Sequence, residues 1–201
     1  MKFKKLNRGA LVLLAAVLVM VACIVWEAKS VKRNREDIES LAAEYIQQSM
    51  EFYVLPEEER DSEKYAESQA NAYMEQAGDF FYSGNNGLYQ EYAQKQMQNL
   101  LSTQVEAGAF LDSLSGEIVQ FTDYTKIGDE ASIYAEIDID YTGTGGSIAD
   151  NFYVTSDALF SENCILRLNF IQTQEGWKLV KTNLLFTSIY GDLDIMTYMD
   201  E

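Results

Sequence analysis

Residues 132–141 read SIYAEIDIDY, and this stretch decides the fold because polar and apolar side chains alternate along it. Successive side chains of a β-strand point to opposite faces of the sheet, so this alternation predicts a strand with one buried and one solvated face. Such half-buried strands are typical of antiparallel sheets. The side chains expected on the buried face are Ile133, Ala135, Ile137, Ile139 and Tyr141.

Strand patterns continue on both sides of this stretch. The preceding strand is expected to turn at Gly128-Asp129, and the last two strands are expected to form a hairpin around Glu175-Gly176. The connection in the middle is longer. The expected strands cover residues 117–126, 133–141, 163–173 and 177–188, with a short one over 152–155.

The residues before this meander have a helical period instead, with apolar side chains recurring at spacings of three and four. Pro56, the glycines of residues 84–87 and Gly116 are expected to end successive helices, and Gly108 is a possible break. The expected helices cover residues 30–54, 62–82 and 88–114. Helices followed by strands predict an α+β fold in which the helices pack on one side of a curved four-strand antiparallel sheet.

The last hairpin carries a resemblance to a known family. Its strands read CILRLNF over residues 164–170 and EGWKLV over residues 175–180. A strand followed by a Gly-Trp-Lys return strand resembles the NTF2-like (SnoaL-like) superfamily, and the resemblance covers about residues 60–190. More distantly, a membrane-anchored domain of this kind resembles the VirB8 and TcpC conjugation proteins. The Asn-Pro-x-Gly motif of VirB8 is missing, because Pro56 is the single proline.

An apolar run, GALVLLAAVLVMVACIVW, covers residues 9–26 and contains no charge. Its 18 residues would span roughly 27 Å as a helix, close to the hydrocarbon thickness of a bilayer. We therefore predict a transmembrane anchor over residues 9–26. The other expected parts are a cytoplasmic tail over 1–8, a helical stalk over 27–59, which can continue directly from the anchor, and an NTF2-like extracytoplasmic domain over 60–201.

The orientation and processing of this run have alternatives. Each flank carries four Lys or Arg residues, so the charge rule alone does not choose an orientation. A short tail stays inside more easily than a long domain, so we expect the N-terminus in and the C-terminal domain outside the cell membrane. Met20-Val21-Ala22-Cys23 also resembles a bacterial lipobox, in which Cys23 would be lipidated, and a cleaved signal peptide is a third reading.

Charge and residue usage exclude several functions. Of the 32 acidic residues, 31 lie from Glu36 onward, while only seven of the 15 basic residues do, a net charge of about −24 for this part. Such a surface repels nucleic acid. The chain has no His, which removes Ser-His and Cys-His nucleophile pairs. Cys23 and Cys164 are not expected to meet, so no disulfide framework is predicted, and no metal set or cofactor motif is recognised. We expect a bacterial source.

Aromatic residues are numerous, with 13 Tyr, 10 Phe and two Trp. Some of them are candidates for an apolar ligand pocket between helices and sheet, and the alternative is that they fill the core. The pocket candidates are Tyr45, Tyr73, Phe81, Phe170 and Trp177. Glu136, Asp138 and Asp140 share a strand face, which we expect to be solvated, and no catalytic residue is assigned.

The sequence therefore favours a non-enzymatic function. We expect a membrane-anchored binding or scaffold domain outside the cytoplasm that engages a protein partner or a small ligand. One alternative is a SnoaL-like enzyme that uses a buried carboxylate. The other is a VirB8- or TcpC-like component of a conjugation or secretion machine.

Overall fold

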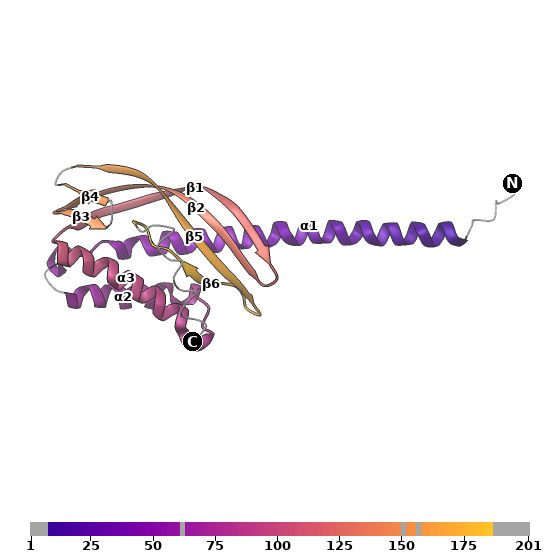
Figure 1. The fold of residues 1–201 in the computed structure, drawn as a ribbon, viewed down its shortest axis with the longest axis horizontal. Helices are drawn as coiled ribbons and strands as arrows, with labels where there is room; N and C mark the ends of the chain where they lie inside the picture. Colours follow the sequence, from indigo (N-terminus) through magenta and orange to yellow (C-terminus); the bar gives the residue numbers. More distant parts are fainter. Residues whose placement is uncertain (1–7, 61–62, 150–151, 156–157, 187–201) are drawn as a thin grey trace. The chain divides into compact units, whose positions relative to one another are not determined.

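The computed structural model describes residues 8–60, 63–149, 152–155 and 158–186 (Figure 1). The predicted tail over residues 1–8, except Arg8, and the chain after Phe186 lie outside the described residues. The described α-helices are α1 (Arg8–Ser49), α2 (Glu63–Ala77) and α3 (Leu88–Ala107). The short 3₁₀ helices are η1 (Met50–Tyr53), η2 (Glu57–Glu59), η3 (Gly78–Phe80) and η4 (Asn85–Gly87). The strands are β1 (Phe110–Ile127), β2 (Glu130–Thr144), β3 (Gly146–Ala149), β4 (Phe152–Val154), β5 (Phe160–Thr173) and β6 (Gly176–Thr182).

The chain divides into two compact units, Met1–Ile38 and Glu39–Glu201. In the first unit the apolar side chains from Val12 to Trp26 are exposed, and α1 is the one described helix long and apolar enough to cross a membrane. The second unit begins at Glu39 because Ala42, Tyr45 and Ile46 are buried within it. Of the stalk predicted over residues 27–59, residues 27–38 therefore lie outside the second unit.

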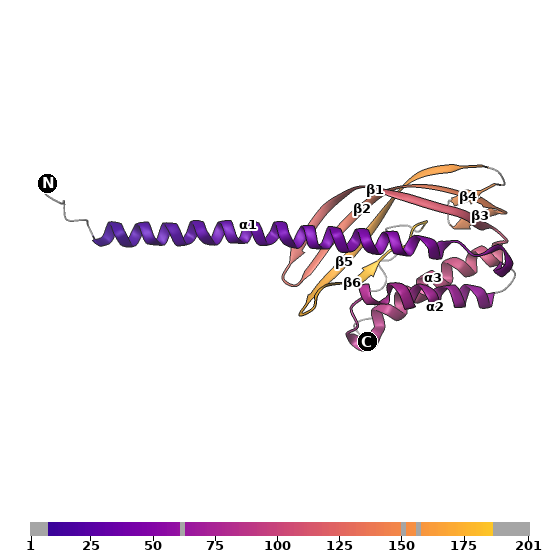
Figure 2. The ribbon, with the colours of Figure 1, turned by 180° about the vertical axis from the view of Figure 1, so that it is seen from behind.

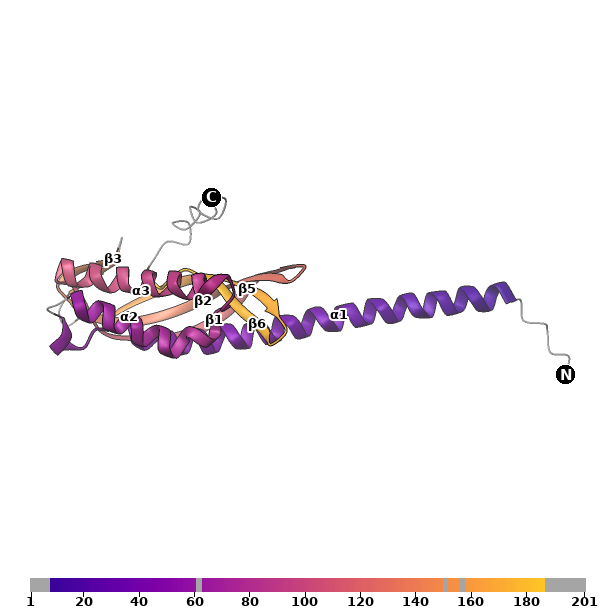
Figure 3. The same ribbon diagram turned by 90° about the horizontal axis from the view of Figure 1, so that it is seen from below.

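The main sheet of the second unit has four antiparallel strands among the described residues, in the order β1-β2-β5-β6. Ile137 at the middle of β2 lies opposite Ile118 of β1 and Cys164 of β5. Helices α2 and α3 lie side by side and cover one face of this curved sheet (Figure 3). The predicted α+β class, with helices on one side of a four-strand antiparallel sheet, is confirmed.

The core lies between the helices and this face. The five side chains predicted to be buried on β2, from Ile133 to Tyr141, are all 0% exposed. Leu168 and Phe170 of β5 and Leu179 of β6 are buried as well, as are Met97 and Leu101 of α3. Each fully buried aliphatic side chain contributes about 1.5–3 kcal/mol, so this core supplies most of the driving force for packing helices on the sheet.

The predicted helix over residues 88–114 is too long, because α3 ends at Ala107 and β1 begins at Phe110. Gly108 takes the left-handed conformation, with φ of 61°. Its N–H donates to Val105 O, and the next N–H, of Ala109, donates to Gln104 O, a common arrangement for ending a helix. The apolar residues 110–111 fit a helix stripe as well as a strand, so the pattern did not distinguish them.

Two other predicted elements also end early. Helix α2 ends at Ala77, and residues 78–80 tighten into η3, so Phe81 is extended rather than helical. Strand β6 ends at Thr182 rather than at residue 188. Beyond Thr182, the side chain of Asn183 makes the hydrogen bonds to β5 that a backbone would otherwise make. Its Oδ1 accepts from Arg167 N, and its Nδ2 donates to Ile165 O.

A small two-stranded sheet, β3-β4, lies at one end of the main sheet in both Figures 1 and 2. Gly145 connects it to β2, with φ of +100°. A Cβ at this position would overlap the carbonyl oxygen of Gly108 and lie 2.7 Å from Ala109 Cα. Gly145 therefore allows the end of α3 to pass directly against the start of the small sheet.

Gly145→Ala should destabilise the second unit more than Gly128→Ala. Both glycines have positive φ, and each substitution costs about 1 kcal/mol in backbone strain. Gly128 has open space around its missing Cβ, whereas Gly145 meets backbone, so we expect Gly145→Ala to cost about 3 kcal/mol or more in the free energy of unfolding. Urea unfolding followed by tryptophan fluorescence measures both; equal losses would contradict the close approach at Gly145.

Candidate functional site

The five side chains predicted to line a ligand pocket are all buried in the second unit. Tyr45, Tyr73, Phe81 and Phe170 are at most 2% exposed, and Trp177 is 8% exposed. The ring of Tyr45 stands edge-on to the rings of Phe80 and Phe81, with centroids 5.8 and 5.7 Å apart. The five side chains are therefore buried, and Tyr45 packs ring against ring with Phe81. That they line a ligand pocket stays a prediction.

Tyrosine hydroxyls within this packing are paired with one another or with backbone. Tyr45 and Tyr73 share a hydrogen bond of 2.8 Å between their hydroxyls, and Tyr53 OH accepts from Leu185 N at 3.1 Å. Burial raises the pKa of all three phenols well above the ordinary value, so these side chains are neutral hydrogen-bonding groups of the core.

The carboxylates of β2 lie on the opposite, solvated face of the sheet. Asp138 and Asp140 are exposed, Asp138 accepts from Asn163 Nδ2 at 2.8 Å, and Asp140 accepts from Ser161. Glu136 accepts from Gln120 Nε2 on the same face. These residues are where the alternation in residues 132–141 predicts them.

Cysteine does not form a site with these groups. Cys23 is exposed on α1, and Cys164 is buried in β5, where burial raises its thiol pKa to about 11. Among the described residues, no three His, Cys, Asp or Glu side chains are placed to hold a metal ion. Lipidation of Cys23 stays a prediction.

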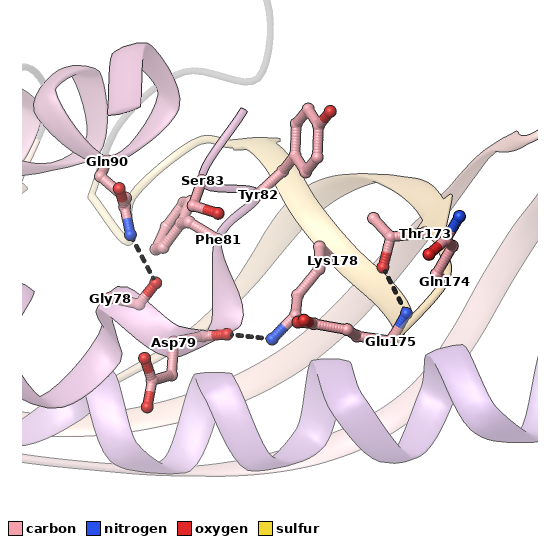
Figure 4. A pocket seen from close by; sticks show the side chains of 10 residues that line it. All are labelled: Gly78, Asp79, Phe81, Tyr82, Ser83, Gln90, Thr173, Gln174, Glu175 and Lys178. Atoms are coloured by element: carbon pink, nitrogen blue, oxygen red, sulfur yellow. Dashed lines mark hydrogen bonds between the residues drawn. The ribbon is translucent and has the colours of Figure 1, made fainter. Parts of the chain in front are cut away.

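Open space occurs instead where β5 turns into β6. A hollow of about 300 Å³ lies between the segment 78–83 and this turn, with Gln90 of α3 on its wall (Figure 4). A second hollow of about 490 Å³ shares Tyr82, Thr173 and Gln174 with the first and reaches Asp129 in the β1–β2 turn. We call the two together the rim groove. Its lining residues are Gly78, Asp79, Phe81, Tyr82, Ser83, Gln90, Asp129, Ile171, Gln172, Thr173, Gln174, Glu175 and Lys178.

The wall over residues 78–83 is fixed by pairing with the edge strand β6. Phe81 forms a parallel bridge with Leu179, and Tyr82 N donates to Leu179 O at 2.8 Å. Lys178 Nζ donates to Asp79 O at 2.6 Å, as Figure 4 shows. Gln90 Nε2 donates to Gly78 O at 3.1 Å and attaches the same segment to α3. The groove therefore has a fixed wall.

The opposite wall is the tight β5–β6 turn, whose geometry is fixed by Thr173. Its hydroxyl donates to Gly176 O at 2.8 Å and accepts from Glu175 N at 3.1 Å. Gln172 N donates to Asp129 O at 2.7 Å and connects this turn to the β1–β2 turn. Asp79, Asp129 and Glu175 are among the lining residues, with Lys178 and several amide- or hydroxyl-bearing residues, so the lining is polar and carries more acidic than basic residues.

Sequence reasoning identified the turns beside this groove but not the groove itself. The glycines at 84–87 and the Glu175-Gly176 pair predicted chain reversals, and both are present. The parallel pairing of residues 81–82 with β6 joins segments almost a hundred residues apart, and Lys178 and Asp79 are separated by 99 positions. Short-range periodicity gives no signal for such a contact.

Comparisons with known proteins found similarity to solved structures only. No family model and no curated protein sequence matches the chain. Among solved structures, a provisionally assigned NTF2-like dehydratase from Streptomyces avermitilis is 13% identical, with a TM-score of 0.31, and covers 47% of this chain. The chain spans 56% of that protein's length.

Two structures from Novosphingobium aromaticivorans are also similar. A provisionally assigned aromatic ring hydroxylase is 15% identical, with a TM-score of 0.36, covering 67% of this chain and 92% of that one. An NTF2-like protein with a cystatin-like fold is 16% identical, with a TM-score of 0.34, covering 82% and 90%. NTF2-like proteins are thus among the structures that this chain resembles, as the last hairpin predicts.

Alkaline pH should destabilise the fold through the buried tyrosines. Because burial raises the pKa of Tyr45 and Tyr73, the folded state keeps protons that the unfolded chain loses. Their contribution is complete below about pH 10 and falls above it, by up to about 1.4 kcal/mol per pH unit for each tyrosine. The Tyr45→Phe/Tyr73→Phe double variant should show a shallower fall when urea unfolding is measured at pH 9, 10 and 11. An unchanged slope would contradict the burial of these phenols.

Proposed function

We propose that the chain is a membrane-anchored binding or scaffold domain that holds the rim groove outside the cytoplasm for a protein partner or a small polar ligand. The observation that supports this most directly is the distribution of space in the second unit. Aromatic side chains are buried under the sheet, whereas the groove between residues 78–83 and the β5–β6 turn is open, polar and fixed by hydrogen bonds. In this proposal, the ligand binds in the rim groove.

The location of acidic groups favours binding over catalysis. A SnoaL-like enzyme with a buried carboxylate would need an acid beneath the sheet, where desolvation makes a carboxylate a useful base. Asp138 and Asp140 are exposed on the outer face, and the acids of the groove lie at its open rim. The buried polar side chains among the described residues are Ser49, Gln104, Thr182 and Asn183.

Anchoring rests on the first unit. The side chains from Val12 to Trp26 are apolar and exposed along α1, a state that costs about 1.5–3 kcal/mol for each large side chain in water and is relieved in lipid. Basic residues flank this stretch on both sides, and Trp26 closes it at the position expected for an interfacial aromatic side chain. We propose that this stretch spans the membrane once and that the second unit lies outside the cytoplasm.

Protease added to intact cells should degrade the second unit, and mass spectrometry of the membrane fraction should find the N-terminal peptide unmodified and uncleaved. Retention of residues 1–26 identifies a transmembrane anchor. A diacylglycerol-modified Cys23 at the new N-terminus would instead identify a lipoprotein. Full protection of the second unit in intact cells, together with degradation after lysis, would overturn the orientation.

Photo-crosslinking tests the rim groove as the binding surface. A p-benzoylphenylalanine replacing Gln174, which is exposed in the groove, should give a discrete crosslinked product in living cells, with the attached peptide identified by mass spectrometry. The matched control replaces Asn99, which is exposed on α3 and not part of the groove. The same product from both positions, or none from Gln174 in a correctly folded protein, would contradict binding at the groove.

A further inference from the structure

The first unit carries a short basic stretch immediately after its exposed apolar side chains. Residues 27–35 read EAKSVKRNR, with four basic residues and one acidic residue. The four basic side chains are exposed on α1, and we call them the outer collar: Lys29, Lys32, Arg33 and Arg35. From Glu36 onward the chain has 31 acidic and seven basic residues, so the collar is a local reversal of charge.

The collar begins at the depth where the headgroup layer of a bilayer would begin. Trp26 closes the apolar stretch and is 77% exposed, and α1 continues without a break through the collar to Ser49. At about 1.5 Å per residue, Lys29 lies roughly 4.5 Å beyond Trp26 along the helix and Arg33 roughly 10 Å beyond it. The headgroup layer is about 5–7 Å thick on each side, and long basic side chains extend toward it. The collar is therefore within reach of lipid phosphates.

Three of the collar side chains lie on one side of the helix. At about 3.6 residues per turn, Lys29, Lys32 and Arg33 fall within about 100° of its circumference, and Val31 and Asn34 lie toward the opposite side. Lys32 Nζ is also 3.6 Å from the carboxylate of Glu36, but the two side chains are 78% and 62% exposed. An ion pair this exposed is weak, so a lipid phosphate competes with it for Lys32.

The charge rule for membrane topology gives no reason for this collar. That rule favours Lys and Arg on the cytoplasmic side, and the four collar residues equal in number those that precede the apolar stretch. Anionic phospholipids instead place negative phosphates at the depth of the collar. Each Lys or Arg near such a surface strengthens attachment by roughly fivefold, so four of them distinguish an anionic lipid from a neutral one.

We propose that the outer collar binds the headgroups of anionic phospholipids, so that the anchor gathers these lipids around itself in the outer leaflet. This inference rests on the proposed membrane anchoring and names the class of lipid that the anchor selects. Its driving force is charge attraction, which is screened over about 8 Å at physiological salt and over about 3 Å at 1 M salt. The preference therefore weakens as salt is raised.

Energy transfer from Trp26 to labelled lipids measures this preference in nanodiscs that contain the full chain. The host lipid is phosphatidylcholine, and a trace lipid with a pyrene-labelled acyl chain has either a phosphatidylglycerol or a phosphatidylcholine headgroup. Trp26 lies at the collar end of the apolar stretch, so it reports the lipids beside the collar, and Trp177 contributes equally with both labels. At 50 mM salt we expect at least twofold more transfer to the phosphatidylglycerol label, and near-equal transfer at 1 M salt.

Matched variants separate the collar from overall charge. Lys29→Gln/Arg33→Gln removes two positive charges from the collar and should abolish at least half of the excess transfer. Lys64→Gln/Lys95→Gln removes two exposed positive charges from helices of the second unit and should leave the excess unchanged. Lys29→Arg/Arg33→Lys keeps the charge of the collar and should also keep the excess. Circular dichroism checks that each variant is folded.

Two results would overturn the proposal: equal transfer to both labels in the native chain at 50 mM salt, or equal losses in the two glutamine variants. The proposed function fails separately. A chain that does not enter phosphatidylcholine nanodiscs would overturn the membrane anchor itself, whereas a chain that enters them and shows no preference between the labels would overturn this inference alone.

Discussion

The packing of aromatic rings against the apolar face of β2 and β5 is the constraint on which the rest of the second unit depends. A sheet with one apolar face must cover it, and here Tyr45, Tyr73 and Phe81 come from helices and loops to do so. Large rings fill space efficiently, and the shared hydrogen bond between two tyrosine hydroxyls satisfies polar groups that would otherwise be costly to bury. The two hollows described above lie at the rim of the sheet.

The edge of the sheet explains the form of this rim. Edge strands expose unpaired backbone groups, and proteins commonly cover them. In this chain the extended residues 81–82, immediately after η3, pair with β6 and cover part of its edge. The same pairing forms a wall opposite the β5–β6 turn. Protection of an edge and formation of a groove are thus two results of one contact, and Lys178 and Gln90 hold it from either side.

Acidic side chains are prominent on the surface of the second unit. The outer face of the sheet carries Glu136, Asp138 and Asp140, and the lining of the rim groove also has more acidic than basic residues, so the second unit presents acidic surfaces in more than one direction. An excess of acid keeps a domain soluble and disfavours anionic partners.

The sequence by itself determined the class of fold and the apolar helix at its start, because both depend on local periodicity. The alternation from Ile133 to Tyr141 identified the central strand and its buried face, and the run of residues 9–26 identified the candidate span. The sequence did not fix the boundary between helix and strand where an apolar residue suits both, as at Phe110 and Leu111. Tertiary structure alone decided how deeply Tyr45, Tyr73, Phe81, Phe170 and Trp177 are buried and that a groove lies at the rim. Both outcomes depend on contacts such as Phe81 with Leu179, between segments far apart in the chain, and whether packed rings leave a cavity depends on how their shapes fit in three dimensions.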